Sequence, residues 1–238
     1  MKAICFLCLG LLIGGCAATS TEPKARVDTS MEAEMPPYSG PKASLAVSKF
    51  EWKAKEAENG VKDGLRDMLT TVLVQSKRFK VLERQELGSI KDEIGLSESS
   101  YADEREGIEK GKIKVADILV VAAITGWEPG AEKTGGGVGG FGPGWLGAIG
   151  GAFKKSYLAM DIRIISSATS EILASTRIEG EAKEVDLGVL AGGIFGSVPL
   201  GAALSKYSKT PMEKAIRVCL KEAVKYISEN TPKEYFKY

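Results

Sequence analysis

Apolar and polar residues follow one another along the chain in blocks of two kinds. Some blocks have the length or the alternation of strands, and others repeat apolar residues at the spacing of an amphipathic helix. Their order predicts an α/β (α+β) fold, in which one mixed sheet is flanked by helices. Strands are expected at 43–52, 79–84, 116–128, 156–166 and 171–182, and helices at 60–76, 85–96, 103–114 and 211–227.

The same pattern predicts which faces are buried. The run 116–128 is continuously apolar, which is typical of a strand covered on both faces. Strand 156–166 alternates and returns through a turn at 167–171, as in a hairpin. The helix at 85–96 is expected to bury an apolar stripe. The inward positions are Leu158, Met160, Ile162 and Ile164 on the strand, and Leu87, Ile90 and Ile94 on the helix.

The last helix has the clearest apolar face. Pro211 stands at its start, where the fixed φ of proline suits the first helical turn. Because Cys219 belongs to this face, it is expected to be a buried and inert thiol. The apolar positions are Met212, Ile216, Cys219, Leu220, Ala223, Val224 and Ile227.

The N-terminus carries the strongest local motif. Lys2 precedes an apolar run over 3–13, as in a secretory signal. The run is too short for a membrane-spanning helix. It ends in "LIGGC", which resembles a bacterial lipobox, although a plain secretory signal containing a cysteine is the alternative. We therefore expect a signal peptide at 1–15 and a lipidated Cys16 that carries acyl chains.

Lipidation at Cys16 determines the expected location. Ala17 is not the aspartate that commonly retains lipoproteins in the inner membrane, so we expect an outer-membrane lipid anchor with the domain facing the periplasm. Residues 16–42 are rich in Ser, Thr, Pro and Glu and predict a flexible tether. Residues 43–238 are expected to form the folded domain. Only Cys16 and Cys219 remain after processing, so no internal disulfide is expected.

Composition excludes several functions. The chain has 238 residues, no histidine and a formal net charge of +1. The lack of histidine removes Ser-His-Asp and Cys-His catalysis and His-ligated zinc, and the charge gives no basic nucleic-acid surface. The sequence "GVGGFG" at 137–142 matches a nucleotide-binding pattern, but no clean helix start follows it. We expect no enzyme, no cofactor and no metal.

Two uncharged, glycine-rich segments interrupt the pattern, at 134–153 and 187–205. Glycine loses much backbone entropy on folding and adds no side chain to a core, so these segments require a function. Trp127, Trp145 and Tyr157 flank or lie within the first segment, which is typical of a membrane-interface girdle but equally of a core. Asp161 and Arg163 on the hairpin are expected on a solvated face.

The chain resembles the CsgG family of outer-membrane lipoproteins, which form the curli-secretion channel. The resemblance covers most of the chain from Cys16 onward. Besides the lipobox, it is carried by "LERQEL" (82–87), "ADILVVAAITGWE" (116–128), "GGGVGGFG" (135–142), "DIRIISSATSEILAS" (161–175) and "PMEKAIRVCLKEAVKYI" (211–227).

The resemblance implies a periplasmic α/β domain that contributes two β-hairpins to a barrel shared by a homo-oligomeric ring, with secreted polypeptide as cargo. Inserts at about 128–160 and 180–207 lie where these hairpins are expected. Each insert is long enough for two barrel strands of roughly 9–11 residues. The loop that narrows the family's pore corresponds to 50–59, which is shorter and more charged here and offers no equivalent residues.

Two alternatives stay open. Apolar residues within both segments are also spaced as in short membrane-inserting or packing helices. The protein is therefore either a subunit of an oligomeric secretion channel or a periplasm-facing structural or adaptor lipoprotein that uses the segments for protein packing. An enzyme that uses lysine or carboxylate chemistry is a third hypothesis, for which no cluster of such residues is suitably spaced.

Overall fold

The computed structural model of the protein describes residues 38–55, 58–103, 105, 107–109, 111–130, 155–183 and 200–238. The predicted signal peptide, Cys16, most of the predicted tether and Trp145 lie outside the described residues.

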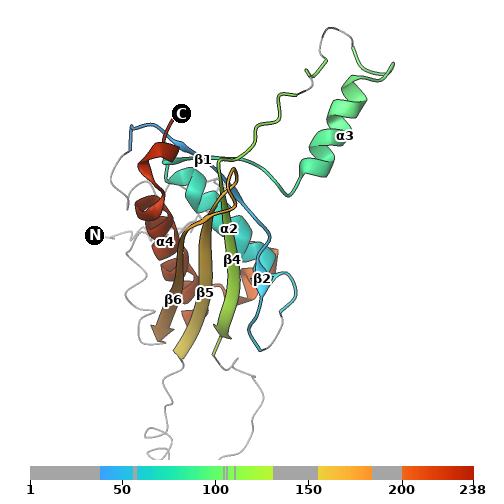
Figure 1. Ribbon diagram of the computed structural model, residues 1–238. Coiled ribbons are helices and arrows are strands. Elements are labelled where there is room, and N and C mark those ends of the chain that lie inside the picture. Colours follow the sequence, from blue (N-terminus) through green and yellow to red (C-terminus); the bar gives the residue numbers. More distant parts are fainter. Residues whose placement is uncertain are drawn as a thin grey trace, which may run out of the picture.

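A six-stranded mixed sheet forms the centre of the fold and confirms the predicted fold class (Figure 1). The strand order is β3-β1-β4-β5-β6, and the short β2 lies beside β4. β1 pairs in parallel with β3 and β4, whereas β4, β5 and β6 form an antiparallel meander. The strands are β1 Ala43–Val47, β2 Glu51–Trp52, β3 Phe79–Val81, β4 Ile118–Glu128, β5 Lys155–Ser166 and β6 Ile172–Lys183.

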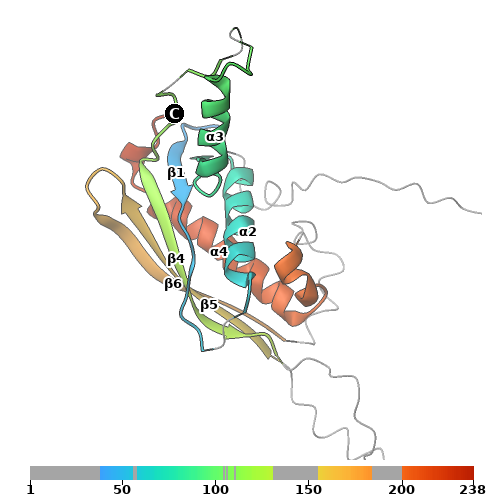
Figure 2. The same cartoon turned by 90° about the vertical axis from the view of Figure 1, so that its right-hand side faces the viewer.

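Two helices, α2 (Val61–Gln75) and α4 (Pro211–Asn230), cover one face of the sheet (Figures 1 and 2). All the predicted apolar positions of α4 are buried, and they face the inward side chains of β5 and β6. The core lies between these two helices and the sheet. Each fully buried aliphatic side chain there adds about 1.5–3 kcal/mol to the stability of the fold. No helix among the described residues combines the length and apolar character needed to cross a bilayer.

Helix α4 lies very close to the sheet at Gly180 of β6. A Cβ atom at Gly180 would overlap the carbonyl oxygen of Ala215 and lie 2.9 Å from the Cβ of Cys219. A side chain larger than hydrogen would therefore push the helix away from the sheet. The predicted inward residues of β5 are buried here as well, with Leu158, Met160, Ile162 and Ile164 all 0% exposed.

The opposite face of the sheet is open among the described residues, which corrects the prediction that strand 116–128 is covered on both faces. Leu119 and Val121 of β4 point to this face and are only half-buried. Their partners on β5 are Ile165 and Arg163. An antiparallel meander can leave one face in water, and the apolar run of β4 did not distinguish this arrangement from a fully covered strand.

Helix α3 (Leu87–Ser97) lies where the sequence predicted a helix, but its predicted inward stripe was wrong. None of its residues is buried, and Ile90 is 37% exposed. The helix projects away from the sheet (Figures 1 and 2). The helix predicted at 103–114 was also wrong, because the described residues 107–109 and 111–114 are not helical.

Two strand boundaries differ from the sequence prediction. The stretch 43–52 forms two strands that are separated at 48–50, and both pair with β4. The stretch 79–84 is a strand only as far as Val81. The strands near the β3 edge of the sheet are therefore shorter than predicted. The β5–β6 hairpin closely matches its prediction.

Candidate functional site

Both glycine-rich segments connect to one end of the sheet, which we call the insert end (Figure 1). At this end Glu128 of β4 pairs with Tyr157 of β5, and Lys155 of β5 pairs with Lys183 of β6. The chain that leaves β4 therefore returns on the neighbouring strand. The second segment then leaves from the next strand along.

Short-range contacts fix the strand ends at the insert end. The Ser156 hydroxyl donates to the carbonyl oxygen of Pro129 at 2.9 Å, which ties the exit of β4 to the start of β5. Lys155 forms an ion pair with Glu181 on β6 at 2.6 Å. The hydrogen bond from Lys155 to Glu181 raises the pKa of Lys155. These contacts place the two points of exit next to each other.

The carboxylate of Glu58 is the hub of a polar cluster beside the insert end. It accepts hydrogen bonds from Trp127 Nε1 at 3.0 Å and from the Tyr207 hydroxyl at 2.5 Å. Lys206 Nζ lies 2.7 Å from the same carboxylate. Trp127 is at the end of β4, before the first segment, and Lys206 and Tyr207 belong to the 3₁₀ helix η4 (Ala202–Tyr207), after the second. We call Glu58, Trp127, Lys206 and Tyr207 the clamp.

Aromatic packing supports the clamp. Trp127 contacts the ring of Trp52 at 5.7 Å between centroids and that of Tyr207 at 5.4 Å, the latter edge to face. Such pairs add about 0.5–1.5 kcal/mol beyond their buried area. Trp127 is only 8% exposed and belongs to the core, so it is a core residue and not part of a membrane-interface girdle. Tyr157 is half-buried.

Hydrogen bonds within the clamp favour a charged Glu58, a charged Lys206 and a neutral Tyr207 at neutral pH. Partial burial opposes the charge on Glu58, but hydrogen bonds from Lys206, Tyr207 and Trp127 outweigh burial and lower the pKa of Glu58. Burial, and then the hydrogen bond to Glu58, raises the pKa of Tyr207 to about 12. The hydrogen bond to Glu58 also raises the pKa of Lys206. A carboxylate, an ammonium and a neutral phenol therefore meet at one point.

The backbone before α2 brings Glu58 into position. Gly60 precedes the helix with φ of 76°, a left-handed conformation that favours glycine. A Cβ atom there would lie 2.9 Å from the Cβ of Ala203 in η4. No sequence pattern indicated the clamp, because Glu58 lies in a charged loop and its partners are far away along the chain.

The remaining predicted residues have separate environments. Cys16 lies outside the described residues. Cys219 is a buried free thiol, as predicted, and burial raises its pKa to about 12. Asp161 and Arg163 lie on the open face of the sheet, as predicted, where Asp161 accepts a hydrogen bond from Thr125 at 3.4 Å. None of these residues belongs to the clamp.

Comparison with known families gives one match. The family described as curli production assembly/transport component CsgG matches residues 34–235. This range contains the whole described domain except the last residues. No curated protein matches the sequence.

Solved structures resemble the fold at low sequence identity. The hypothetical protein CT253 from Chlamydia trachomatis is 10% identical, with a TM-score of 0.47, over 79% of this chain and 97% of its own. Protein XCC0632 from Xanthomonas campestris is 10% identical, with a TM-score of 0.44, over 82% of this chain and 90% of its own. The lipoprotein GNA1162 from Neisseria meningitidis is 12% identical, with a TM-score of 0.34, over 63% of this chain and 92% of its own.

Proposed function

The chain belongs to the family of the curli production assembly/transport component CsgG, and from this premise we propose that it is a subunit of a homo-oligomeric secretion channel. In this proposal Cys16 is lipidated, the domain faces the periplasm, and the two glycine-rich segments enter the outer membrane. The protein catalyses no reaction and uses no cofactor. Its mechanism is conduction of a polypeptide through the ring.

The observation that carries the proposal is the position of both segments at the insert end. The first segment lies within the stretch 129–154, between Glu128 and Lys155, which end two strands already paired as a hairpin. A hairpin connection needs only about 2–5 loop residues, so a connection of this length calls for a function of its own. Continuing the hairpin for roughly 9–11 residues per strand would cross the hydrocarbon layer.

The second segment supports the same interpretation. The segment was predicted at 187–205, but Ala202–Tyr207 form η4 and Leu204 is buried, so only the stretch between Lys183 and Ala202 is free to leave the domain. This stretch leaves from the strand next to the first segment. Backbone groups in lipid must be paired, so hairpins from a single subunit would have unpaired edges there. Pairing between hairpins of neighbouring subunits closes a barrel and removes those edges. A homo-oligomeric ring follows from this requirement.

The clamp has a mechanical role in the proposal. It joins the end of β4, before the first segment, to η4, after the second, through the single carboxylate of Glu58. Both hairpins would therefore start from one rigid base. We infer that the clamp keeps the proposed barrel strands of a subunit aligned while they pair with their neighbours.

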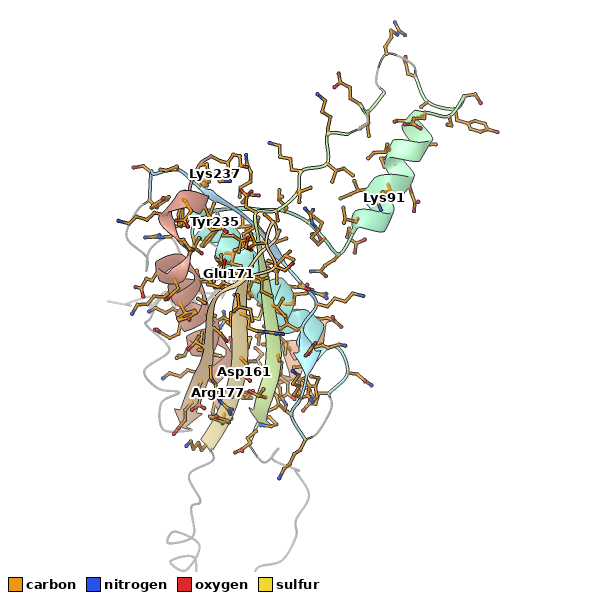
Figure 3. The ribbon with its side chains drawn as sticks, in the orientation of Figure 1. Lys91, Asp161, Glu171, Arg177, Tyr235 and Lys237 are labelled. Carbon is orange, nitrogen blue, oxygen red and sulfur yellow. The ribbon has the colours of Figure 1, made fainter. Side chains whose placement is uncertain are left out.

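The tether is long enough for this orientation. Tyr38 packs against Phe236, whose neighbour Lys237 lies at the end of the domain opposite the insert end (Figure 3). The chain from Cys16 to Tyr38 can reach about 75 Å when fully extended. A strand as long as β5 spans only about 40 Å. A lipid on Cys16 can therefore lie in the membrane that the hairpins enter.

Conductance across a planar bilayer tests the proposal. The lipidated full-length protein, extracted in detergent, is expected to give stepwise conductance. A matched variant in which residues 131–154 are replaced by a short Asn-Gly turn keeps the domain, because this turn suits a two-residue hairpin loop, but it should give no conductance. Absence of conductance from the full-length protein, together with a soluble monomer after Cys16→Ala, would favour the adaptor lipoprotein instead.

A further inference from the structure

Residues 83–115, which we call the arm, expose an unusual share of the apolar surface. Nine large apolar side chains are exposed among the described residues, and six of them belong to the arm. Tyr101 is 92% exposed and Val115 is 80% exposed. The six are Ile90, Leu96, Tyr101, Ile108, Ile113 and Val115.

The helix of the arm lacks the support that other helices receive. α3 has 11 residues, none of them buried, and no side chain caps its start. Isolated helices shorter than about 12–15 residues are marginal in water, because most helix stability comes from packing an apolar face. An exposed apolar surface of this kind marks an interaction site. The apolar side chains of the arm are therefore available to a partner.

The helical part of the arm is acidic. Residues 83–98 contain five carboxylates and two cations, a formal net charge of −3. Asp92 and Glu93 stand exposed on α3. A partner surface should therefore combine apolar or aromatic groups with positive charge.

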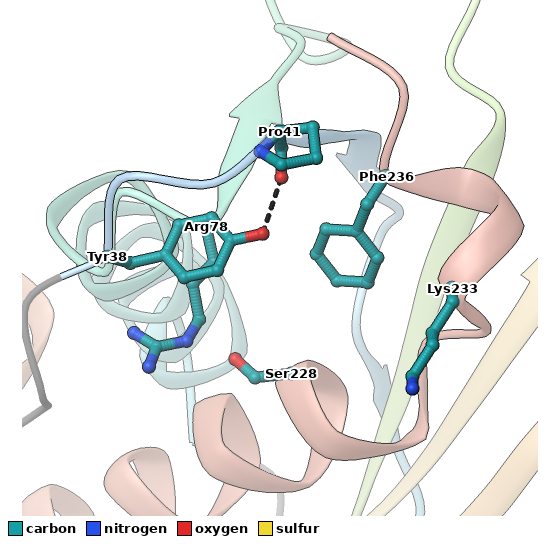
Figure 4. Close-up of a pocket in the computed structure, with 6 residues that line it drawn as sticks. All are labelled: Tyr38, Pro41, Arg78, Ser228, Lys233 and Phe236. Atoms are coloured by element: carbon teal, nitrogen blue, oxygen red, sulfur yellow. Dashed lines mark hydrogen bonds between the residues drawn. The ribbon is translucent and has the colours of Figure 1, made fainter.

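The domain contains such a surface at the end opposite the insert end. A pocket of about 360 Å³ is lined by two aromatic rings, two cations, a proline and a serine, with no carboxylate among its described lining residues (Figure 4). The Arg78 guanidinium lies 5.0 Å from the centroid of the Tyr38 ring. We call it the basic pocket; its residues are Tyr38, Pro41, Arg78, Ser228, Lys233 and Phe236.

Positive charge extends around the basic pocket. The ammonium of Lys114, and then burial and Lys42, lower the pKa of Lys80, because a second charge of the same sign is unfavourable at this spacing. Lys237 also lies over the rings of Tyr235 and Tyr238, at 6.0 Å from each centroid, and its ammonium pairs with Asp117 at 3.4 Å. The charge of this surface is opposite to that of α3.

The positions of the arm and the basic pocket suit subunits that repeat side by side. Lys91 of α3 lies on one side of the domain, and Tyr235 and Lys237, beside the basic pocket, lie on the other, all at the end away from the inserts (Figure 3). A sideways step would bring the arm of one subunit to the pocket of the next. All insert ends would then point the same way. Two different complementary patches on one chain give a head-to-tail contact, which closes into a ring when the rotation allows.

We propose that the acidic arm of each subunit docks into the basic pocket of the next subunit, with a second copy of this chain as the partner. This inference rests on the homo-oligomer proposed above and deepens it, because it names the two surfaces that join the copies. Apolar side chains such as Ile90 pack against Tyr38 and Phe236. The carboxylate of Glu93, three residues after Ile90 and on the same face of α3, lies toward the basic side of the pocket.

Disulfide cross-linking of the lipidated full-length protein tests this contact. In the double variant Ile90→Cys/Ser228→Cys, mild oxidation should give a ladder of covalent multimers on a non-reducing gel. A mixture of the two single variants should stop at the dimer, because each copy then offers only one accessible thiol. The unmodified chain, whose Cys219 is buried, is the control and should stay monomeric on the gel.

The outcomes separate this inference from the proposed function. A ring that persists on native analysis but gives no ladder would overturn the arm contact and leave the channel proposal intact. An internal disulfide, seen as a faster-moving monomer, would mean that the arm folds onto its own pocket and would also overturn it. An unmodified chain that is monomeric in detergent would contradict both proposals.

Charge reversal provides a second measurement that does not depend on cysteine geometry. Asp92→Lys/Glu93→Lys and Arg78→Glu/Lys233→Glu should each raise the concentration at which the oligomer dissociates about tenfold or more. Mixing the two variants should restore assembly in alternating order. The matched control is Lys62→Glu/Lys225→Glu, which changes two exposed lysines on α2 and α4 and should have little effect. Equal effects of the control, or no rescue on mixing, would contradict the contact.

Discussion

At the residue scale, one carboxylate connects parts of the chain that are far apart in sequence. Glu58 joins the entry of α2, the end of β4 and η4 through two hydrogen bonds and an ion pair. The side chain is 21% exposed, so the contacts form in partly excluded solvent and are stronger than exposed surface pairs. The clamp should therefore contribute measurably to stability.

Glu58→Gln is expected to destabilise the protein by about 1–3 kcal/mol at pH 7, because the amide keeps the size but loses the charge that Lys206 contacts. The pKa of Glu58 is below its ordinary value of 4.5. Its ionisation therefore stabilises the fold above that value and ceases to do so as the pH falls through the lowered pKa. Urea unfolding from pH 7 to pH 3 should show the difference between wild type and variant closing below about pH 4.5.

The matched control is Glu222→Gln, an exposed carboxylate on α4. It should change the free energy of unfolding by less than about 0.5 kcal/mol. A Glu58→Gln variant that is as stable as this control at pH 7 would show that the clamp does not stabilise the fold.

Glycine positions offer a second comparison at this scale. Gly180→Ala should cost about 1–3 kcal/mol or more, since the added methyl overlaps the backbone of α4 at Ala215. Gly88→Ala in α3 meets nothing within 4 Å. It should leave stability unchanged or raise local helicity by up to about 1 kcal/mol. Thermal unfolding of both variants checks the pair. Equal effects would contradict the close packing of α4 on β6.

At the element scale, the sequence predicted the positions of helices and strands better than it predicted which of their faces are buried. The patterns of α4 and β5 are amphipathic and periodic, so both elements were predicted with their buried faces, and β6 was predicted as the hairpin partner of β5. The burial of β4 was predicted wrongly, because an apolar strand looks the same whether one face or both are covered. The apolar stripe of α3 predicted a buried face, but an exposed stripe has the same periodicity.

The clamp could not be predicted for a related reason. Its members sit at the ends of three elements, and they meet only when the sheet register and the packing of η4 are fixed. A single glutamate in a charged loop carries no pattern. Trp127 was noted from the sequence, but only its position beside Tyr207 and Trp52 distinguished a core residue from a membrane-interface residue.

Hydrogen exchange on α3 tests the arm as an element. In the protein at a concentration where it is monomeric, backbone amides of Leu87–Ser97 should exchange within seconds, because no side chain of the helix is buried. Assembly should slow their exchange at least about tenfold. Amides of α4 serve as the internal control and should be protected in both states. Equal exchange of α3 before and after assembly would contradict the docking of the arm.

At the scale of the whole molecule, the two proposals assign different roles to the two ends of the domain. The insert end carries both glycine-rich segments and the clamp, and the opposite end carries the arm and the basic pocket (Figures 1 and 3). Contacts between copies at one end would hold the proposed hairpins in register at the other. In the proposed ring, lateral assembly and membrane insertion would be coupled through the sheet.

Electron microscopy of the lipidated protein, extracted and purified in detergent, tests the central claim most directly. We predict rings of identical subunits with a central opening, and loss of the belt of detergent-covered density when residues 131–154 are replaced. Monomers would contradict the channel account. So would compact particles without a central opening, seen at a protein concentration where assembly of the extracted protein is complete.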